Sequence, residues 1–247
     1  MSDNTNNYYF NWNKRKDTLP PINKTYNKVL IFQYGKVGST SIRGSHSSGK
    51  YYPTISETYN EKFIQVHSHE VAKDVLRKYK NILIINIVRL PIDRNISAFF
   101  ESLQSHCKNY KKLSLKEITE KYNELYSVNH TDKWMSTFFD MFNINIDTFT
   151  FDKNNKYNKF TFFNGNDMLL FRYEDLEYIT SNILPKYDIN VTKKYNESSK
   201  KYYRVEHKYF KKLYKVSDFE KEQIINSKFT NIYYSKKEVQ EHIEKYL

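Results

Sequence analysis

An unbroken apolar run at residues 81–88 limits the possible folds of this chain more than any other feature. The run reads NILIINIV and is rich in β-branched residues, which favour a strand. Because apolar and polar residues do not alternate in it, both faces of the strand must be covered, as in the centre of a parallel sheet. Pro91 follows closely and suits the first turn of a helix.

Similar patterns recur along the chain and predict alternating strands and helices. We expect strands at 28–34, 62–67, 82–88 and 168–173, and a strand pair near 148–163. We expect a loop and helix at 35–46 and helices at 70–79, 92–105, 114–126 and 131–143, from 175, and near 204–215 and 217–227. This alternation predicts an α/β fold in which helices cover both faces of a parallel sheet, giving three layers.

Residues 28–42, KVLIFQYGKVGSTSI, join the first strand to a glycine-bounded loop and a helix start. The two glycines allow a tight turn and a close approach to an anion. Lysine brings a mobile positive charge, and three consecutive hydroxyls accompany the N–H groups of the helix start. We therefore predict a phosphate-binding loop. It consists of Gly35, Lys36, Val37, Gly38, Ser39, Thr40 and Ser41. The alternative is a plain strand-to-helix turn whose hydroxyls cap the helix.

The position of the lysine distinguishes this loop from that of nucleoside triphosphatases. Their loop reads G-x-x-x-x-G-K-[ST], whereas Lys36 lies two residues before Gly38. The pattern K-x-G-S-T-S instead resembles the 5′-phosphosulfate loop of sulfotransferases, which use 3′-phosphoadenosine 5′-phosphosulfate (PAPS). The resemblance implies a P-loop-like three-layer fold, and it implies that this loop holds the 5′-phosphate.

A second segment strengthens the resemblance. Residues 88–100, VRLPIDRNISAFF, resemble the sulfotransferase 3′-phosphate motif V-R-[DN]-P-x-[DE]-R-x-x-S-x-[FY]. This implies that Arg89 and Ser97 hold the 3′-phosphate of PAPS and of its product PAP. Leu90 departs from the motif, because that family usually has Asp or Asn there. The alternative is that Arg89 forms a surface ion pair with Asp93 and that Ser97 faces solvent.

Two later segments indicate which sulfotransferases the chain resembles most. Residues 172–176, RYEDL, follow a predicted strand, as in sulfotransferases, and residues 132–163 resemble the middle of the capsular-polysaccharide-type members. The similarity covers roughly residues 27–235. It implies transfer of a sulfuryl group from PAPS to an acceptor hydroxyl, with a carbohydrate as the expected acceptor.

The general base is expected among two histidines. Residues 63–69, FIQVHSH, predict a strand that ends in His67 and His69, and period-two alternation would place both side chains on one face. In the glycan sulfotransferases that this chain resembles, an H-x-H at this place includes the base. The resemblance thus implies His69 as the base, with His67 as its partner or substitute, and Lys36 as the group that stabilises the leaving oxygen. The alternative is that both histidines are structural.

Composition sets the remaining expectations. The 247 residues suffice for one domain at 28–247, preceded by a polar and flexible tail at 1–27. A net charge of +12 favours anionic partners, although nucleic acid is not the expected one. The only cysteine is Cys107, so no intrachain disulfide is possible. No apolar stretch is long enough for a membrane span and no signal peptide is evident, which predicts a cytoplasmic protein. The sequence has no recognisable cluster of metal ligands, so no metal cofactor is expected.

Two other function classes stay open. One is a P-loop nucleotide kinase-like enzyme, against which the missing G-x-x-x-x-G-K-[ST] loop argues. The other is a non-catalytic protein of the same fold that binds anions or nucleic acid through its basic surface, for which the tyrosine- and lysine-rich residues 200–209 are the best candidate. The sequence reveals neither the acceptor nor the oligomeric state.

Overall fold

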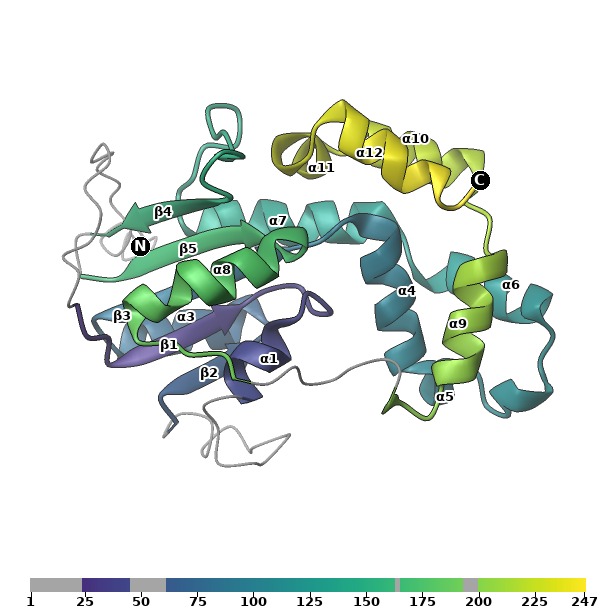
Figure 1. Ribbon diagram of the computed structural model, residues 1–247, viewed down its shortest axis with the longest axis horizontal. Coiled ribbons are helices and arrows are strands. Elements are labelled where there is room, and N and C mark those ends of the chain that lie inside the picture. The colour runs from purple at the N-terminus through teal and green to yellow at the C-terminus, as the bar shows by residue number, and fades with distance from the viewer. Residues whose placement is uncertain (1–23, 45–60, 163–164, 193–199) are drawn as a thin grey trace, which may run out of the picture. The chain divides into compact units, whose positions relative to one another are not determined.

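The computed structural model describes residues 24–44, 61–162, 165–192 and 200–247 (Figure 1). Contacts divide the chain into two compact units, each built from two separate segments. Residues 1–88 and 137–195 form the first, here called the sheet unit, and residues 89–136 and 196–247 form the second, the helical unit. Residues 1–23 of the expected N-terminal tail lie outside the described residues.

The sheet unit contains a five-stranded sheet in the order β2-β1-β3-β5-β4. Its strands are β1 Lys28–Phe32, β2 Phe63–Val66, β3 Ile82–Val88, β4 Tyr157–Thr161 and β5 Asp167–Arg172. The first four strands in that order run parallel, and β4 pairs antiparallel with β5 at one edge. Every residue of β3 is buried, as predicted for a strand with both faces covered. The expected α/β class with a largely parallel sheet is confirmed.

Helices cover both faces of this sheet, in agreement with a three-layer α/β arrangement (Figure 1). On one face, side chains such as Ile31 and Ile85 pack with Ile179 of helix α8, Leu176–Asn182, and Ile42 of helix α1, Ser39–Gly44. On the other face, Phe32 contacts Phe138 at a ring-centroid distance of 5.4 Å. Phe138 belongs to helix α7, Val128–Met141, and helix α3, His69–Lys78, completes that layer.

The helical unit has a core of aromatic rings. Its helices are α4 Pro91–Glu101, α5 Leu103–His106, α6 Leu115–Leu125, α9 Arg204–Leu213, α10 Asp218–Asn226, α11 Lys228–Tyr233 and α12 Lys236–Glu244, together with the first part of α7. Phe99 of α4 packs against Tyr122 of α6 at 5.6 Å, and Phe100 packs against Phe210 of α9 at 5.2 Å. Edge-to-face geometry in both pairs adds to the free energy gained by burying the rings.

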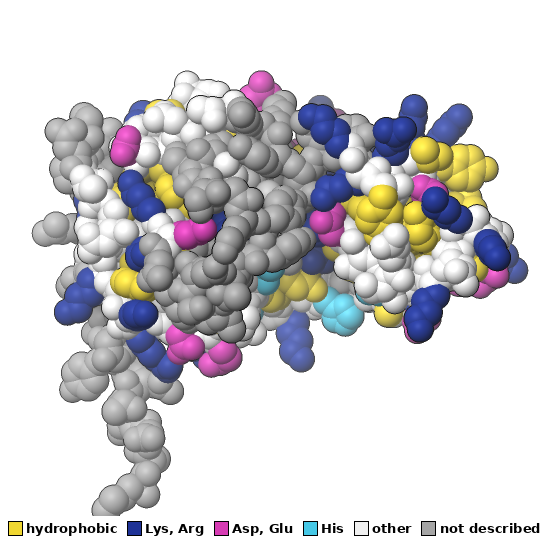
Figure 2. Space-filling model, turned by 90° about the horizontal axis from the view of Figure 1, so that it is seen from below, with side chains coloured by type: hydrophobic (Ala, Val, Ile, Leu, Met, Phe, Trp, Pro, Cys, Tyr) yellow, Lys and Arg dark blue, Asp and Glu magenta, His cyan; other side chains and the backbone are white. Residues whose placement is uncertain are grey.

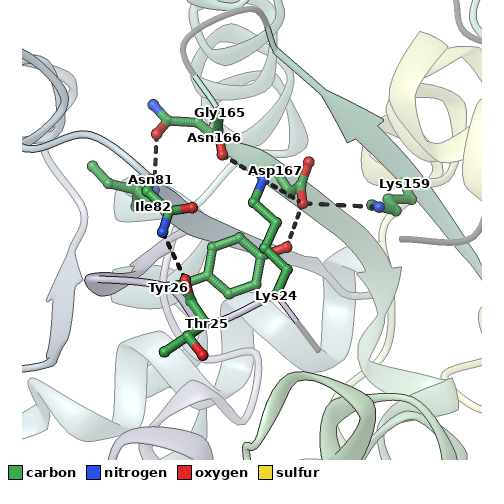
Figure 3. Close-up of polar contacts among 9 residues, drawn as sticks. All are labelled: Lys24, Thr25, Tyr26, Asn81, Ile82, Lys159, Gly165, Asn166 and Asp167. Atoms are coloured by element: carbon green, nitrogen blue, oxygen red, sulfur yellow. Dashed lines mark hydrogen bonds and ion pairs between the residues drawn. The ribbon is translucent and has the colours of Figure 1, made fainter. Parts of the chain in front are cut away.

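A buried polar cluster lies at the amino ends of the strands in the sheet unit (Figure 3). Asp167, the first residue of β5, is 1% exposed, and its carboxylate accepts hydrogen bonds from Tyr26 Oη and, at 3.1 Å, from Lys24 Nζ. Lys159 Nζ lies 3.8 Å from the same oxygen. Asn166 Oδ1 accepts the backbone N–H of Ile82 at 2.8 Å. These contacts connect the segment before β1 with the first residues of β3 and β5, at the amino ends of these strands.

Two predictions about secondary structure were wrong. Of the strand pair expected near 148–163, the described residues form only β4, because the Asn158 side chain, and not a strand backbone, bonds the Thr150 carbonyl and the Asp152 N–H. The C-terminal helices α11 and α12 were not predicted, although Ser235 and Glu238 form a capping box that marks the start of α12.

Candidate functional site

The loop after β1 turns at its two glycines, as the sequence predicts. Gly35 has a φ of +97° and Gly38 a φ of +80°, and between them Lys36 adopts a left-handed φ of +59°. A Cβ atom at Gly38 would lie 2.7 Å from Leu176 Cδ2 and 2.9 Å from a ring carbon of Tyr173. Glycine at position 38 is therefore required both by conformation and by the close approach of the segment after β5.

Gln33 organises this loop, a role that the sequence did not reveal. Its side chain is fully buried just after β1. Gln33 Oε1 accepts the backbone N–H of Gly35, and Gln33 Nε2 donates to Ser39 Oγ at 2.9 Å. One buried amide thus holds the beginning of the loop and the first residue of α1 together. Removing this buried amide would lower the free energy of unfolding by more than the net contribution of two hydrogen bonds, because its buried partners would be left unpaired.

The predicted loop residues differ in what they can offer a ligand. The Val37 side chain is packed in the core, so only the backbone of this residue is available. Ser39 is buried against Gln33, and the Ser41 backbone N–H donates to the Gly38 carbonyl at 3.1 Å. Lys36 and Thr40 are partly exposed. The Lys36 cation and the Thr40 hydroxyl are thus partly accessible, while Val37 and Ser39 serve the loop's own structure.

The two histidines lie at the end of β2, but in different environments. Strand β2 ends at Val66, and His69 is the first residue of α3, so the two side chains do not follow the period-two alternation that was expected. His67 is exposed, and its Nδ1 lies 2.8 Å from the Gln33 carbonyl oxygen. The His69 ring is partly buried and packs edge-on against Phe32 at 5.2 Å. Ser68 between them caps α3 through its hydroxyl.

The contact between His67 and Gln33 fixes the chemistry of the exposed imidazole. A carbonyl oxygen can only accept, so His67 Nδ1 carries the proton of this hydrogen bond. In the neutral ring, Nε2 is then the unprotonated nitrogen and can accept a proton. Because β1 and β2 are parallel neighbours with Phe32 opposite Val66, the loop and His67 emerge side by side at the carboxyl end of the sheet. A Cβ at Gly35 would be 3.8 Å from His67 Cε1.

In the helical unit, Arg89 and Ser97 are brought together as expected. Arg89 directly follows the last residue of β3 along the chain, and its Nη1 donates to Ser97 Oγ at 3.2 Å. The Ser97 hydroxyl in turn donates to the Asp93 carbonyl one helical turn earlier, at 2.8 Å. Leu90 is buried at the N-cap position of α4 and provides no side-chain cap, so the hydrogen bond of the usual Asp or Asn is not replaced.

The Asp93 carboxylate is the centre of a polar cluster that sequence reasoning missed. It accepts hydrogen bonds from Lys211 of α9 and, at 2.9 Å, from Tyr246 Oη near the C-terminus. His242 of α12 places its Nδ1 3.7 Å from the same carboxyl group. These partners are more than a hundred positions away in sequence, and α12 was not predicted, so no local pattern indicated them.

Electrostatics in this cluster favour the charged carboxylate and neutral imidazoles. Burial alone would raise the pKa of Asp93, but the positive charges of Lys211 and Arg89 outweigh it and lower the pKa to about 2. Burial, together with the charges of Lys211 and Arg89, lowers the pKa of His207 to about 4. A surrounding of cations that lowers histidine pKa values is also one that attracts anions.

Comparisons of the chain with protein-family models, with curated proteins and with solved structures found no match. Among the helices that the structure describes, none has the length and apolar character to cross a membrane. Cys107 is buried with a free thiol. Within the described ranges, no three or more His, Cys, Asp or Glu side chains come together as a possible metal site.

Proposed function

We propose that this protein is a PAPS-dependent sulfotransferase that acts on a hydroxyl group of a carbohydrate. One observation carries the proposal. At the carboxyl end of neighbouring parallel strands, the loop that presents Lys36 lies beside an exposed imidazole whose Nδ1–H is held by the Gln33 carbonyl. A cation and a general base at adjacent strand ends are what the transfer of a charged group to a hydroxyl requires.

The donor groups suit PAPS in kind. PAPS carries anionic groups on both its 5′ and 3′ sides, and the chain has two separate sets of anion donors, the loop at 35–41 and the Arg89–Ser97 pair. The neighbouring Lys211 extends the positive environment of Arg89. A guanidinium beside a serine hydroxyl is a common arrangement for binding phosphate. The P-loop-like character of the fold is part of this proposal.

The residues would divide the reaction between them. The bound PAPS supplies an activated sulfuryl group whose sulfur–oxygen bond to the 5′-phosphate breaks as the acceptor oxygen bonds to sulfur. Lys36 would stabilise the negative charge that forms on the departing phosphate oxygen. His67 Nε2 would take the acceptor proton. The geometry favours His67 over the first sequence-based choice, His69, because His67 is exposed and its tautomer is fixed, whereas the His69 ring packs on Phe32.

Nucleotide binding tests the first half of the proposal. Adenosine 3′,5′-bisphosphate should raise the melting temperature more than AMP or ATP, because only it offers a 3′-phosphate to Arg89 and Ser97. Arg89→Ala should weaken binding of the bisphosphate by about 30- to 1000-fold, the loss expected for one charge-assisted phosphate contact. Arg204→Ala, at an exposed arginine of the same unit, is the matched control. Equal shifts with AMP and the bisphosphate would refute the assignment.

Transfer kinetics test the second half. With PAPS and an oligosaccharide mixture as acceptor, Lys36→Ala and His67→Ala should each lower the transfer rate by roughly two to four orders of magnitude. His67→Ala should still bind the bisphosphate, and His69→Ala should retain most of its activity. The opposite ranking of the two histidines would restore His69 as the base. Phosphoryl transfer from ATP that stops when magnesium is chelated would favour a kinase instead.

A further inference from the structure

Helix α9 of the helical unit exposes two adjacent rows of side chains that neither the fold nor the proposed reaction uses. One row is apolar and consists of Val205, Tyr209 and Leu213, which are 67%, 58% and 38% exposed. The other is basic and consists of Arg204, Lys208 and Lys212, all exposed. Within each row the residues are four positions apart, so each row follows one line along the helix.

The opposite side of α9 already fixes the helix in the protein. Phe210 is buried there and packs against Phe100 and Tyr122, with ring-centroid distances of 5.2 and 5.5 Å. Tyr203 and Tyr214 at the two ends of the helix are buried as well. The exposed apolar row is therefore a second hydrophobic stripe and not the core-facing one. A stable surface helix has no need of it.

Another exposed aromatic residue lies just before the helix. Tyr202, 48% exposed, lies two residues before the start of α9 and adds an exposed aromatic ring at that end. Figure 2 shows that hydrophobic side chains on one face of this unit are bordered by lysine and arginine side chains. Apolar and cationic groups are thus presented to the solvent together.

The composition of the two rows decides between possible occupants. A second copy of the same face is disfavoured, because the basic rows would meet each other with like charge. Single-stranded nucleic acid would use the tyrosines and cations but has no place for Val205 and Leu213, which cannot stack on bases. An anionic bilayer uses every member of both rows, because aliphatic side chains enter the acyl boundary, tyrosine lies at the headgroup level and basic residues contact lipid phosphates.

We propose that the exposed face of α9 binds the surface of membranes that contain anionic lipids. The helix would lie in the plane of the interface, with Val205, Tyr209 and Leu213 toward the acyl chains and the basic row among the headgroups. This binding is reversible and depends on salt, because a stripe of three apolar residues is too small to hold the protein without its cations.

Vesicle co-sedimentation tests the proposal with the full chain. The protein should sediment with vesicles of equal parts phosphatidylcholine and phosphatidylserine, and much less with phosphatidylcholine alone. Lys208→Glu with Lys212→Glu should reduce binding by at least about 25-fold, since each basic residue near the surface contributes about a fivefold factor. Lys111→Glu with Lys112→Glu, an equal charge change at exposed residues of the same unit, should have a clearly smaller effect.

A second pair of variants separates insertion from simple charge attraction. Val205→Ser with Tyr209→Ser should abolish most binding although the charge is unchanged, whereas Phe219→Ser, at a 70% exposed residue of α10, should not. Tyr209→Trp should show a blue-shifted emission with anionic vesicles. All of these side chains are exposed, so the variants should fold, which circular dichroism checks. The proposal is overturned if serine variants bind like the wild type, if both vesicle types bind equally, or if the face instead mediates self-association or binds oligonucleotides without vesicle binding.

Discussion

Replacing His242 by phenylalanine should make the protein more resistant to mild acid. His242 is 1% exposed in the helical unit and packs edge-on against the Tyr246 ring at 5.8 Å. The groups that face it are the Asp93 carboxylate and the positive charges of Lys245, Lys211 and Arg89. Burial, supported by these cations and opposed by Asp93, lowers the pKa of His242 from its usual 6.5 to about 4. The imidazole is thus kept neutral in the folded protein.

The sign and size of the effect follow from linkage. Between the two pKa values the unfolded chain binds a proton that the folded protein excludes, so stability falls as the pH falls from 6.5 toward 4. For a single site with these pKa values, the free energy of unfolding at about pH 5 is about 2 kcal/mol lower than at about pH 7.5. The phenylalanine ring preserves the packing with Tyr246 and has no proton to gain, so this loss should disappear.

The assay is urea unfolding of the wild type and of His242→Phe at both pH values. His207 and Asp93 titrate in both proteins, so their contributions largely cancel in the comparison. His130→Phe, at an exposed histidine of α7, is the control and should behave as the wild type. A His242→Phe protein that loses as much stability as the wild type between the two pH values would show that His242 is not the group kept neutral by burial.

Two further substitutions test the sheet unit. Gly38→Ala should destabilise it by about 2–4 kcal/mol, because a Cβ there meets Leu176 and Tyr173 at a positive φ. At Gly165, φ is also +80° but an added Cβ would have nothing within 4 Å, so Gly165→Ala should lower stability only through backbone strain. Equal losses of stability in the two variants would refute the packing argument. Tyr26→Phe should cost about 1.5–3 kcal/mol, since it removes a hydrogen bond to the buried Asp167 carboxylate, and an unchanged urea midpoint would contradict this.

The parts of the fold that the sequence predicted are those set by local pattern. β3 was predicted with its observed bounds, because a continuous apolar run between polar residues leaves little choice. β1 was expected to reach residue 34 but ends at Phe32, because the Gln33 side chain takes the backbone N–H of Gly35 and starts the loop. Such a side-chain contact has no signature in hydropathy.

In the candidate site, too, contacts within a short stretch of sequence could be predicted, and contacts between distant residues could not. The loop and the Arg89–Ser97 pair could be located from their motifs, because each lies within a short stretch of sequence. The surroundings of Asp93 could not, since Lys211 and Tyr246 reach it from distant parts of the chain. The resemblance ranked His69 before His67, whereas the expectation that both side chains leave one face assumed that the strand pattern continues to residue 69, and β2 ends at Val66.

The division of each unit between two chain segments also determines the order in which the protein can be completed during synthesis. β3 leaves the ribosome with β1 and β2 already made, but its other neighbour, β5, begins only at Asp167. At common translation rates one edge of this apolar strand stays unpaired for on the order of ten seconds while the first helices of the other unit are made. That unit in turn closes only when Tyr246, at the end of the chain, reaches Asp93. Nascent chains shorter than about residue 172 should therefore aggregate or require a chaperone.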